Sequence, residues 1–85
     1  MGKEREVIST QDFQTQINKI SGTPLLEKLK KQIRKIVTNP DFGKPLMHGL
    51  AGYRTVYVKP YRILYSFDDN TILLVKFEHR KKVYL

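Results

Sequence analysis

The first half of the chain carries hydrophobic residues at helical spacing. Phe13, Ile17 and Ile20 fall at positions i, i+4 and i+7, which predicts a helix over residues 10–20 with one apolar stripe. Only polar residues stand between them, and Ser21-Gly22 then interrupts the pattern. We therefore expect a short helix that buries one side.

A second, longer helix is predicted to follow. Thr23 suits the N-cap, and Pro24 suits the first helical position, where its missing N–H costs nothing. Asn39-Pro40 ends the helix because the proline ring disfavours helical geometry in the residue before it. The apolar side consists of Leu26, Leu29, Ile33, Ile36 and Val37. The opposite side consists of Lys28, Lys30, Lys31, Arg34 and Lys35. The two helices are expected to form a helical hairpin.

The second half of the chain changes to the pattern of strands. Segments rich in Tyr, Val, Ile, Phe and Thr occupy residues 53–58, 61–67 and 72–77. Lys59-Pro60 and Asp68-Asp69-Asn70 separate them as turns, an opening strand is predicted over Glu4–Ile8, and residues 41–52 are predicted as a surface loop. The order β-α-α-β-β-β predicts an α+β fold. In it the helical hairpin packs on one face of a small, mainly antiparallel sheet and leaves the other face partly open.

Length and composition narrow the classes of function. The 85 residues are expected to form one domain, residues 1–85. The absence of cysteine excludes disulfides and thiolate metal sites and favours a reducing, cytoplasmic setting. With only His48 and His79 as imidazole ligands, no metal site is expected. No glycine-rich loop joins a strand to a helix, and no apolar run approaches the roughly 20 residues of a membrane span. We therefore expect no cofactor and no membrane partner.

The net charge of +8 is concentrated in one part of the sequence. Residues 28–85 hold thirteen basic and four acidic residues, a net charge of +9, whereas residues 1–27 have a net charge of −1. Such a field favours a polyanionic partner, and nucleic acid is preferred over a membrane face. The lysines of the second helix, Lys28, Lys31 and Lys35, either contact RNA or only solvate the helix.

Two motifs in the strand region resemble a known family. Gly-Tyr-Arg at residues 52–54 leads into Pro60-Tyr61-Arg62-Ile63-Leu64-Tyr65, and the chain ends with His79-Arg80-Lys81-Lys82-Val83-Tyr84. This pattern resembles the RelE/ParE superfamily of bacterial and archaeal toxins, whose small α+β fold fits the whole chain. RelE-like members cleave mRNA in the ribosomal A site, ParE-like members poison DNA gyrase, and a partner antitoxin silences both.

The resemblance implies a set of site residues. Arg62 matches the strand arginine that contacts the scissile phosphate, and the other catalytic candidates are Arg80, Tyr84, His79 and Arg54. The residues alone leave a second interpretation open, in which Arg62 pairs with an acidic residue such as Glu78 and only holds the sheet together. Relatives carry a second basic residue two positions after Arg54, where this chain has Val56. The residues expected to bind RNA are Lys59, Lys81, Lys82, Lys28, Lys31 and Lys35.

RNA cleavage without a metal ion sets three chemical requirements. The 2′-hydroxyl must lose its proton, the phosphorane must be stabilised, and the 5′-oxygen must gain a proton. Arg62 and Arg80 can stabilise the phosphorane through fork-like hydrogen bonds. His79 and Tyr84 are the candidates for proton transfer, and the sequence does not choose between them. Arg54 can share a sheet face with Arg62 only if the Lys59-Pro60 turn closes with an odd number of residues.

The expected function is therefore the toxin of a toxin-antitoxin system, acting as a ribosome-dependent, metal-independent mRNA endoribonuclease that inhibits translation. The alternatives are a ParE-like gyrase inhibitor without nuclease activity and a catalytically decayed relative that only binds its antitoxin. The implied partners are a RelB-like antitoxin, in a complex that can be a heterotetramer, together with the ribosome and mRNA.

Overall fold

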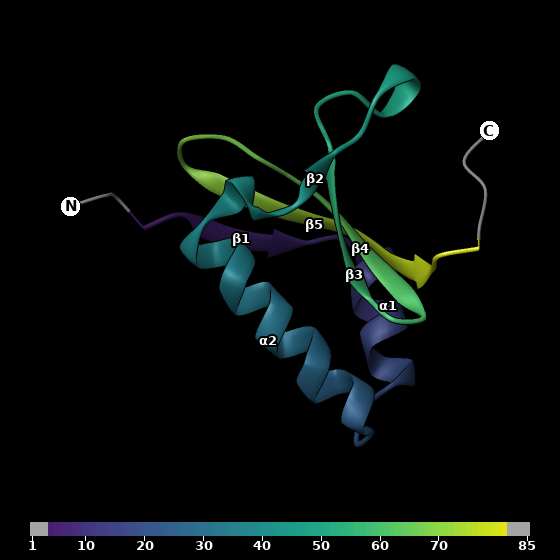
Figure 1. Ribbon diagram of the computed structural model, residues 1–85. Coiled ribbons are helices and arrows are strands. Elements are labelled where there is room, and N and C mark those ends of the chain that lie inside the picture. The colour runs from purple at the N-terminus through teal and green to yellow at the C-terminus, as the bar shows by residue number, and fades with distance from the viewer. Residues whose placement is uncertain (1–3, 82–85) are drawn as a thin grey trace.

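The computed structural model describes residues 4–81 of the chain. Two helices follow an opening strand, and four strands complete the described part (Figure 1). The strands are β1 (Glu6–Ser9), β2 (Lys44–Pro45), β3 (Arg54–Val58), β4 (Tyr61–Phe67) and β5 (Thr71–His79). The helices are α1 (Gln11–Lys19) and α2 (Pro24–Thr38), with 3-10 turns at Pro40–Phe42 and His48–Leu50. Both predicted helices are confirmed to within one residue at each end.

The five strands form one mixed sheet in the order β1-β5-β4-β3-β2. Three of the four pairings are antiparallel, and β1 runs parallel to β5. Both helices lie on the same side of the sheet (Figure 1), which confirms the predicted α+β arrangement. The prediction of a plain loop over residues 41–52 was wrong in one respect, because Lys44 and Pro45 pair with Thr55 and Arg54 and add a fifth strand.

The core lies between the helices and the sheet. Phe13 of α1 and Leu29 and Ile36 of α2 are fully buried. Their partners on the sheet are Val56, Val58, Ile63, Tyr65, Ile72, Leu74 and Phe77. The start of α1 is fixed by Thr10, whose Oγ1 accepts the N–H of Phe13 at 3.1 Å. Within residues 4–81, no helix has the length and apolar character needed to cross a membrane.

Tyr65 connects the core to the segment that follows α2. Its ring is fully buried, and its hydroxyl donates to the carbonyl of Pro40 at 2.6 Å and accepts the N–H of Gly43 at 2.8 Å. A Cβ on Gly43 would lie only 2.5 Å from this hydroxyl, which explains the glycine at that position. Burial raises the pKa of the Tyr65 phenol above its ordinary value of 10.0, so the fold holds the neutral form.

Tyr65→Phe is expected to lower the free energy of unfolding by about 1–3 kcal/mol, because Pro40 and Gly43 each lose a buried hydrogen-bond partner. Since folding raises this pKa, the contribution of Tyr65 is present below pH 10.0 and is lost as the pH rises through the folded-state value. Urea unfolding of the wild-type protein and of Tyr65→Phe at a series of alkaline pH values measures the difference in their free energies of unfolding. A difference in stability that grows above pH 10.0 would contradict the assignment.

Candidate functional site

The register of the β3–β4 hairpin determines which side chains share a face. Val58 pairs with Tyr61 across the two-residue Lys59-Pro60 turn. Tyr57 is therefore opposite Arg62, and on the next strand Arg62 is opposite Glu78. Directly paired residues point to the same side of a sheet. Tyr57, Arg62 and Glu78 thus form one line across three strands, which we call the Arg62 row.

The Arg62 row lies on the face of the sheet away from the helices, because the neighbouring core residues Val58 and Ile63 point to the helix side. Tyr57 is 48% exposed, while Arg62 and Glu78 are half-buried. The Oε2 atom of Glu78 is buried and makes no hydrogen bond within the described part of the chain. The row therefore combines a cation, a carboxylate and an exposed aromatic ring.

Arg80 extends this face beyond the end of β5. Its backbone N–H donates to the carbonyl of Pro60 at 2.9 Å, which continues the β4–β5 pairing by one step. Continued alternation along the strand brings Arg80 to the side of Glu78, and Arg80 and Lys81 are exposed. Two of the predicted residues, Lys82 and Tyr84, lie outside the described residues.

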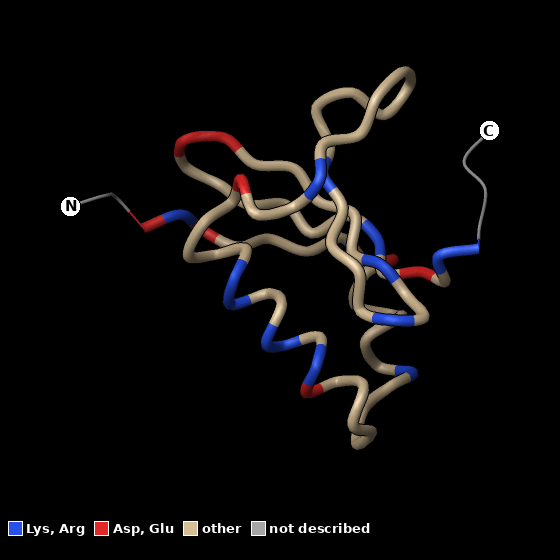
Figure 2. Tube along the Cα trace, viewed as in Figure 1, with Lys and Arg blue, Asp and Glu red and all other residues tan. Residues whose placement is uncertain are grey.

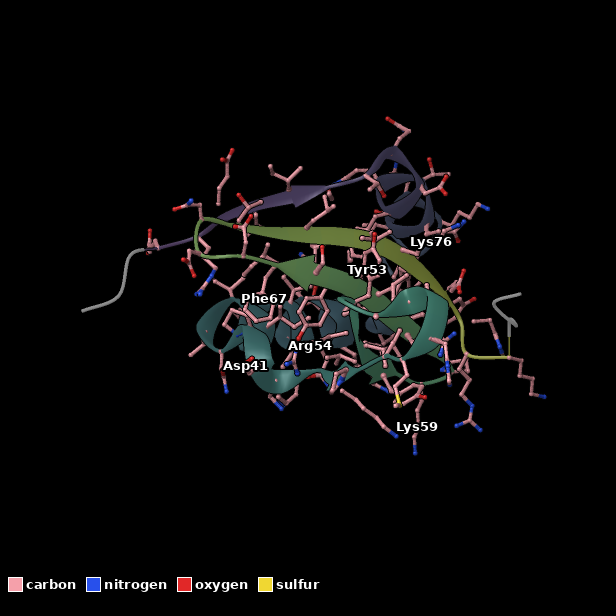
Figure 3. All side chains as sticks on the ribbon, turned by 90° about the horizontal axis from the view of Figure 1, so that it is seen from above. Asp41, Tyr53, Arg54, Lys59, Phe67 and Lys76 are labelled. Atoms are coloured by element: carbon pink, nitrogen blue, oxygen red, sulfur yellow. The ribbon has the colours of Figure 1, made fainter. Side chains whose placement is uncertain are left out.

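Arg54 is separated from the Arg62 row because the turn closes with an even number of residues. Arg54 pairs with Tyr65, on the helix side of the sheet. Its guanidinium bridges to the Asp41 carboxylate at 3.3 Å and donates to the carbonyl of Gly43 at 2.7 Å. It also lies 5.8 Å from the ring centre of Phe67 (Figure 3). These contacts hold the segment after α2 against the sheet.

Arg54→Ala is expected to destabilise the fold by about 1–3 kcal/mol, because it removes charge-assisted hydrogen bonds. Activity per folded molecule should stay within a few-fold of wild type, since Arg54 lies on the other face from Arg62. Thermal unfolding and cleavage measured on the same preparation separate the two effects. A stable variant with lost cleavage would instead assign Arg54 to the reaction.

His79 also lies on the helix side of the sheet. It pairs with Tyr61, and the two rings are 5.6 Å apart. Its Nδ1 accepts the backbone N–H of Lys81 at 3.2 Å. The register thus separates the imidazole from Arg62. Val56, at the position where relatives carry a basic residue, is part of the core and only 6% exposed.

The remaining predicted residues gather along α2 and the β3–β4 turn. Figure 2 shows Lys and Arg along α2, with acidic residues confined to its start. Lys28, Lys31 and Lys35 line a hollow of about 300 Å³ together with Gln32, Tyr57, Val58 and Lys59. Within residues 4–81, no group of three His, Cys, Asp or Glu side chains could hold a metal ion.

The sequence reasoning considered Glu78 only as an ion-pair partner that holds Arg62 in the sheet, and it included neither Glu78 nor Tyr57 among the site residues. Both belong to strands that were predicted or to their immediate continuation, since β5 extends two residues beyond the predicted Phe77. Their relation to Arg62 depends on the pairing register, which the number of turn residues fixes and a hydrophobic pattern does not. The short Lys59-Pro60 turn was the signal that could have indicated both.

The chain is similar to one described family and to several solved structures. Residues 7–84 match the family described as the ParE toxin of type II toxin-antitoxin systems, parDE. No match was found among curated protein sequences.

Three solved structures illustrate the similarity of fold. A YoeB/ParE toxin from Agrobacterium tumefaciens has a TM-score of 0.78 at 18% identity, over 88% of this chain and 98% of that chain. The toxin-antitoxin complex RelBE2 from Mycobacterium tuberculosis gives a TM-score of 0.76 at 24% identity, over 92% of this chain and 100% of that chain. A heterotetrameric YoeB-YefM toxin-antitoxin complex from Staphylococcus aureus gives a TM-score of 0.74 at 15% identity, over 92% and 99%. The RelE-like fold expected from the sequence is confirmed.

Proposed function

Because the chain belongs to the ParE toxin family of type II toxin-antitoxin systems, we propose that it is a RelE-like endoribonuclease that cleaves ribosome-bound mRNA without a metal ion and thereby inhibits translation. The Arg62 row is the observation that carries this proposal. It gives a phosphate-binding cation, a carboxylate and an aromatic surface side by side on the face away from the helices.

Arg62 and Arg80 are the proposed phosphate ligands. Cleavage by the 2′-hydroxyl places additional negative charge on the non-bridging oxygens of the phosphorane. A guanidinium donates two parallel hydrogen bonds to such oxygens, and donors already in place cost no reorganisation when the charge develops. The half-buried position of Arg62 within β4 strengthens this effect, because surrounding protein replaces part of the water.

Glu78 is the proposed general base. It stands directly opposite Arg62 on the neighbouring strand, so a phosphate held by Arg62 brings its ribose close to the carboxylate. Its carboxylate is the proposed acceptor of the 2′-hydroxyl proton. Its Oε2 is buried and makes no hydrogen bond within residues 4–81, so this oxygen reaches the ribose only after the side chain shifts toward the open face. His79 is less suited because it lies on the other side of the sheet. Tyr84, four residues beyond Arg80, remains the candidate that protonates the leaving 5′-oxygen.

An antitoxin is the proposed protein partner, of the RelB-like kind. The RelBE2 and YoeB-YefM structures are toxin-antitoxin complexes, and the latter is described as a heterotetramer. An acidic antitoxin segment complements the net charge of +9 in residues 28–85 of this chain. The same charge attracts ribosomal RNA and mRNA when the antitoxin is absent.

One pair of assays tests the proposal against the gyrase alternative. Primer extension on an mRNA in a translating extract should show toxin-dependent 5′ ends of downstream fragments within codons, and a parallel assay should show unchanged DNA supercoiling by gyrase. The ParE name of the matching family keeps gyrase inhibition as the second candidate. Inhibited supercoiling with intact mRNA would reject the ribonuclease and support that candidate.

A further inference from the structure

Two hollows lie side by side along the basic side of α2. The hollow of about 300 Å³ is bounded by Tyr57 and Lys59 of the β3–β4 hairpin. A second hollow of about 510 Å³ lies toward the end of the helix and is bounded by Phe42. Lys31 and Lys35 line both, so the two hollows adjoin at these side chains, and we call them together the α2 groove. Its complete lining is Lys28, Lys31, Gln32, Arg34, Lys35, Thr38, Asn39, Phe42, Tyr57, Val58 and Lys59.

The composition of the α2 groove fits a single nucleic acid strand. Its lining holds four lysines and one arginine and no carboxylate. An aromatic side chain stands at each end, Tyr57 with 48% and Phe42 with 42% of its surface exposed. Proteins that bind single strands combine basic residues along the backbone with aromatic rings on which bases stack. A double helix offers no unstacked base to Tyr57 or Phe42.

The α2 groove is continuous with the Arg62 row. Tyr57 belongs to both, because it lines the groove and pairs with Arg62 across the β3–β4 hairpin. β2 pairs with β3 only at Thr55 and Arg54, so the edge of β3 beyond Thr55 has no strand beside it within residues 4–81. A single nucleic acid strand bound at Arg62 can therefore pass over Tyr57 and continue along α2. The wall of the groove also carries Gln32, whose Oε1 makes no hydrogen bond within the described part of the chain.

We infer that the α2 groove binds single-stranded RNA that leads to or from the Arg62 row, with Lys31 and Lys35 on its phosphates and Tyr57 and Phe42 on its bases. The choice of RNA rests on the proposed function. The groove therefore binds RNA itself, and the lysines of α2 do more than solvate the helix.

The experiment measures binding of a labelled, unstructured oligouridine of about twelve nucleotides to the full chain by fluorescence anisotropy across a salt series. Lys31→Ala with Lys35→Ala should lower the slope of log K against log salt by about 1.4, since each phosphate contact on a single strand contributes about 0.7. Lys30→Ala is the matched control, because Lys30 lies on the same helix, pairs with Glu27 at 3.8 Å and lines neither hollow. Its slope should not change.

Phe42→Leu tests stacking away from the Arg62 row and should weaken RNA binding about 5- to 150-fold. An unchanged salt slope in the double variant, an equal change in Lys30→Ala, or wild-type affinity in Phe42→Leu would overturn the inference. Tighter binding of duplex DNA or of a DNA oligonucleotide of the same length would also overturn it. The oligouridine binding assay requires neither the ribosome nor cleavage of the RNA, so it tests the α2 groove separately from the proposed function. If the variants change RNA binding as expected but the wild-type protein does not cleave mRNA, the proposed function is rejected and the α2 groove stands. If the wild-type protein cleaves mRNA but the variants do not change RNA binding as expected, the α2 groove is rejected and the proposed function stands.

Discussion

Arg62→Ala is expected to lower the cleavage of ribosome-bound mRNA by a factor of about 10²–10³ and to leave the fold intact. This is the loss seen when one preorganised donor to a developing oxyanion is removed. The side chain lies on the face away from the helices, outside the hydrophobic core, so truncation leaves the packing of the helices unchanged. The first-order cleavage rate on programmed ribosomes at saturating toxin is the direct measurement.

Two further variants make this test specific. Arg62→Lys keeps the charge but not the planar fork of donors, and it should recover only part of the rate. Arg5→Ala is the matched control, because Arg5 donates to the carbonyl of Asp68 at 2.7 Å and lies over Phe67, on the helix side. It should cleave at the wild-type rate. Arg80→Ala is expected to behave as Arg62→Ala does, and full activity in both would reject the proposed site.

Much of the fold could be predicted because the responsible signals are local. Thr23 precedes α2 at the expected N-cap position, and Asn39-Pro40 ends α2 as expected. Asp68 closes the β4–β5 turn by accepting the N–H groups of Asn70 and Thr71, each at 2.8 Å. Each of these features depends on residues a few positions apart, which a sequence displays directly.

The non-local features could not be predicted in the same way. β1 runs parallel to β5 and pairs with Thr71–Leu74, more than sixty positions along the chain, and no local pattern specifies that partner. β2 has only two residues, one of them proline, and it is recognisable only through its contacts with β3.

The site depends on one such non-local feature, namely whether the β3–β4 turn contains an even or an odd number of residues. An odd turn would have put Arg54 on the same face of the sheet as Arg62, whereas the two-residue turn puts Tyr57 opposite Arg62 and leaves Arg54 bound to Asp41. The same register aligns Glu78 with Arg62 and turns His79 to the other face. Sequence resemblance therefore indicated Arg62, the sequence offered Glu78 as one acidic partner for it, and the register established that Glu78 and Tyr57 are its neighbours.

Glu78→Gln is expected to reduce cleavage by a factor of about 10²–10⁴, the usual contribution of a general base. The substitution keeps the size of the side chain and removes only its charge and basicity. Binding of RNA should not weaken and should tighten slightly, because the carboxylate opposite Arg62 repels the phosphate that Arg62 attracts. The expected pattern is therefore a lower maximal rate with an unchanged or lower half-saturating toxin concentration.

A single-turnover assay on programmed ribosomes, with toxin concentration varied, gives both quantities. Glu27→Gln is the matched control, since this exposed glutamate on α2 contacts only Lys30 among the ion pairs of residues 4–81. It should leave the maximal rate unchanged. If Glu78→Gln cleaves at the wild-type rate, Glu78 only neutralises Arg62 in the sheet. Tyr84 then becomes the candidate for proton abstraction, and Tyr84→Phe is the variant that tests it. If Glu78→Gln instead loses RNA binding along with cleavage, the carboxylate orients Arg62, and its role is positioning.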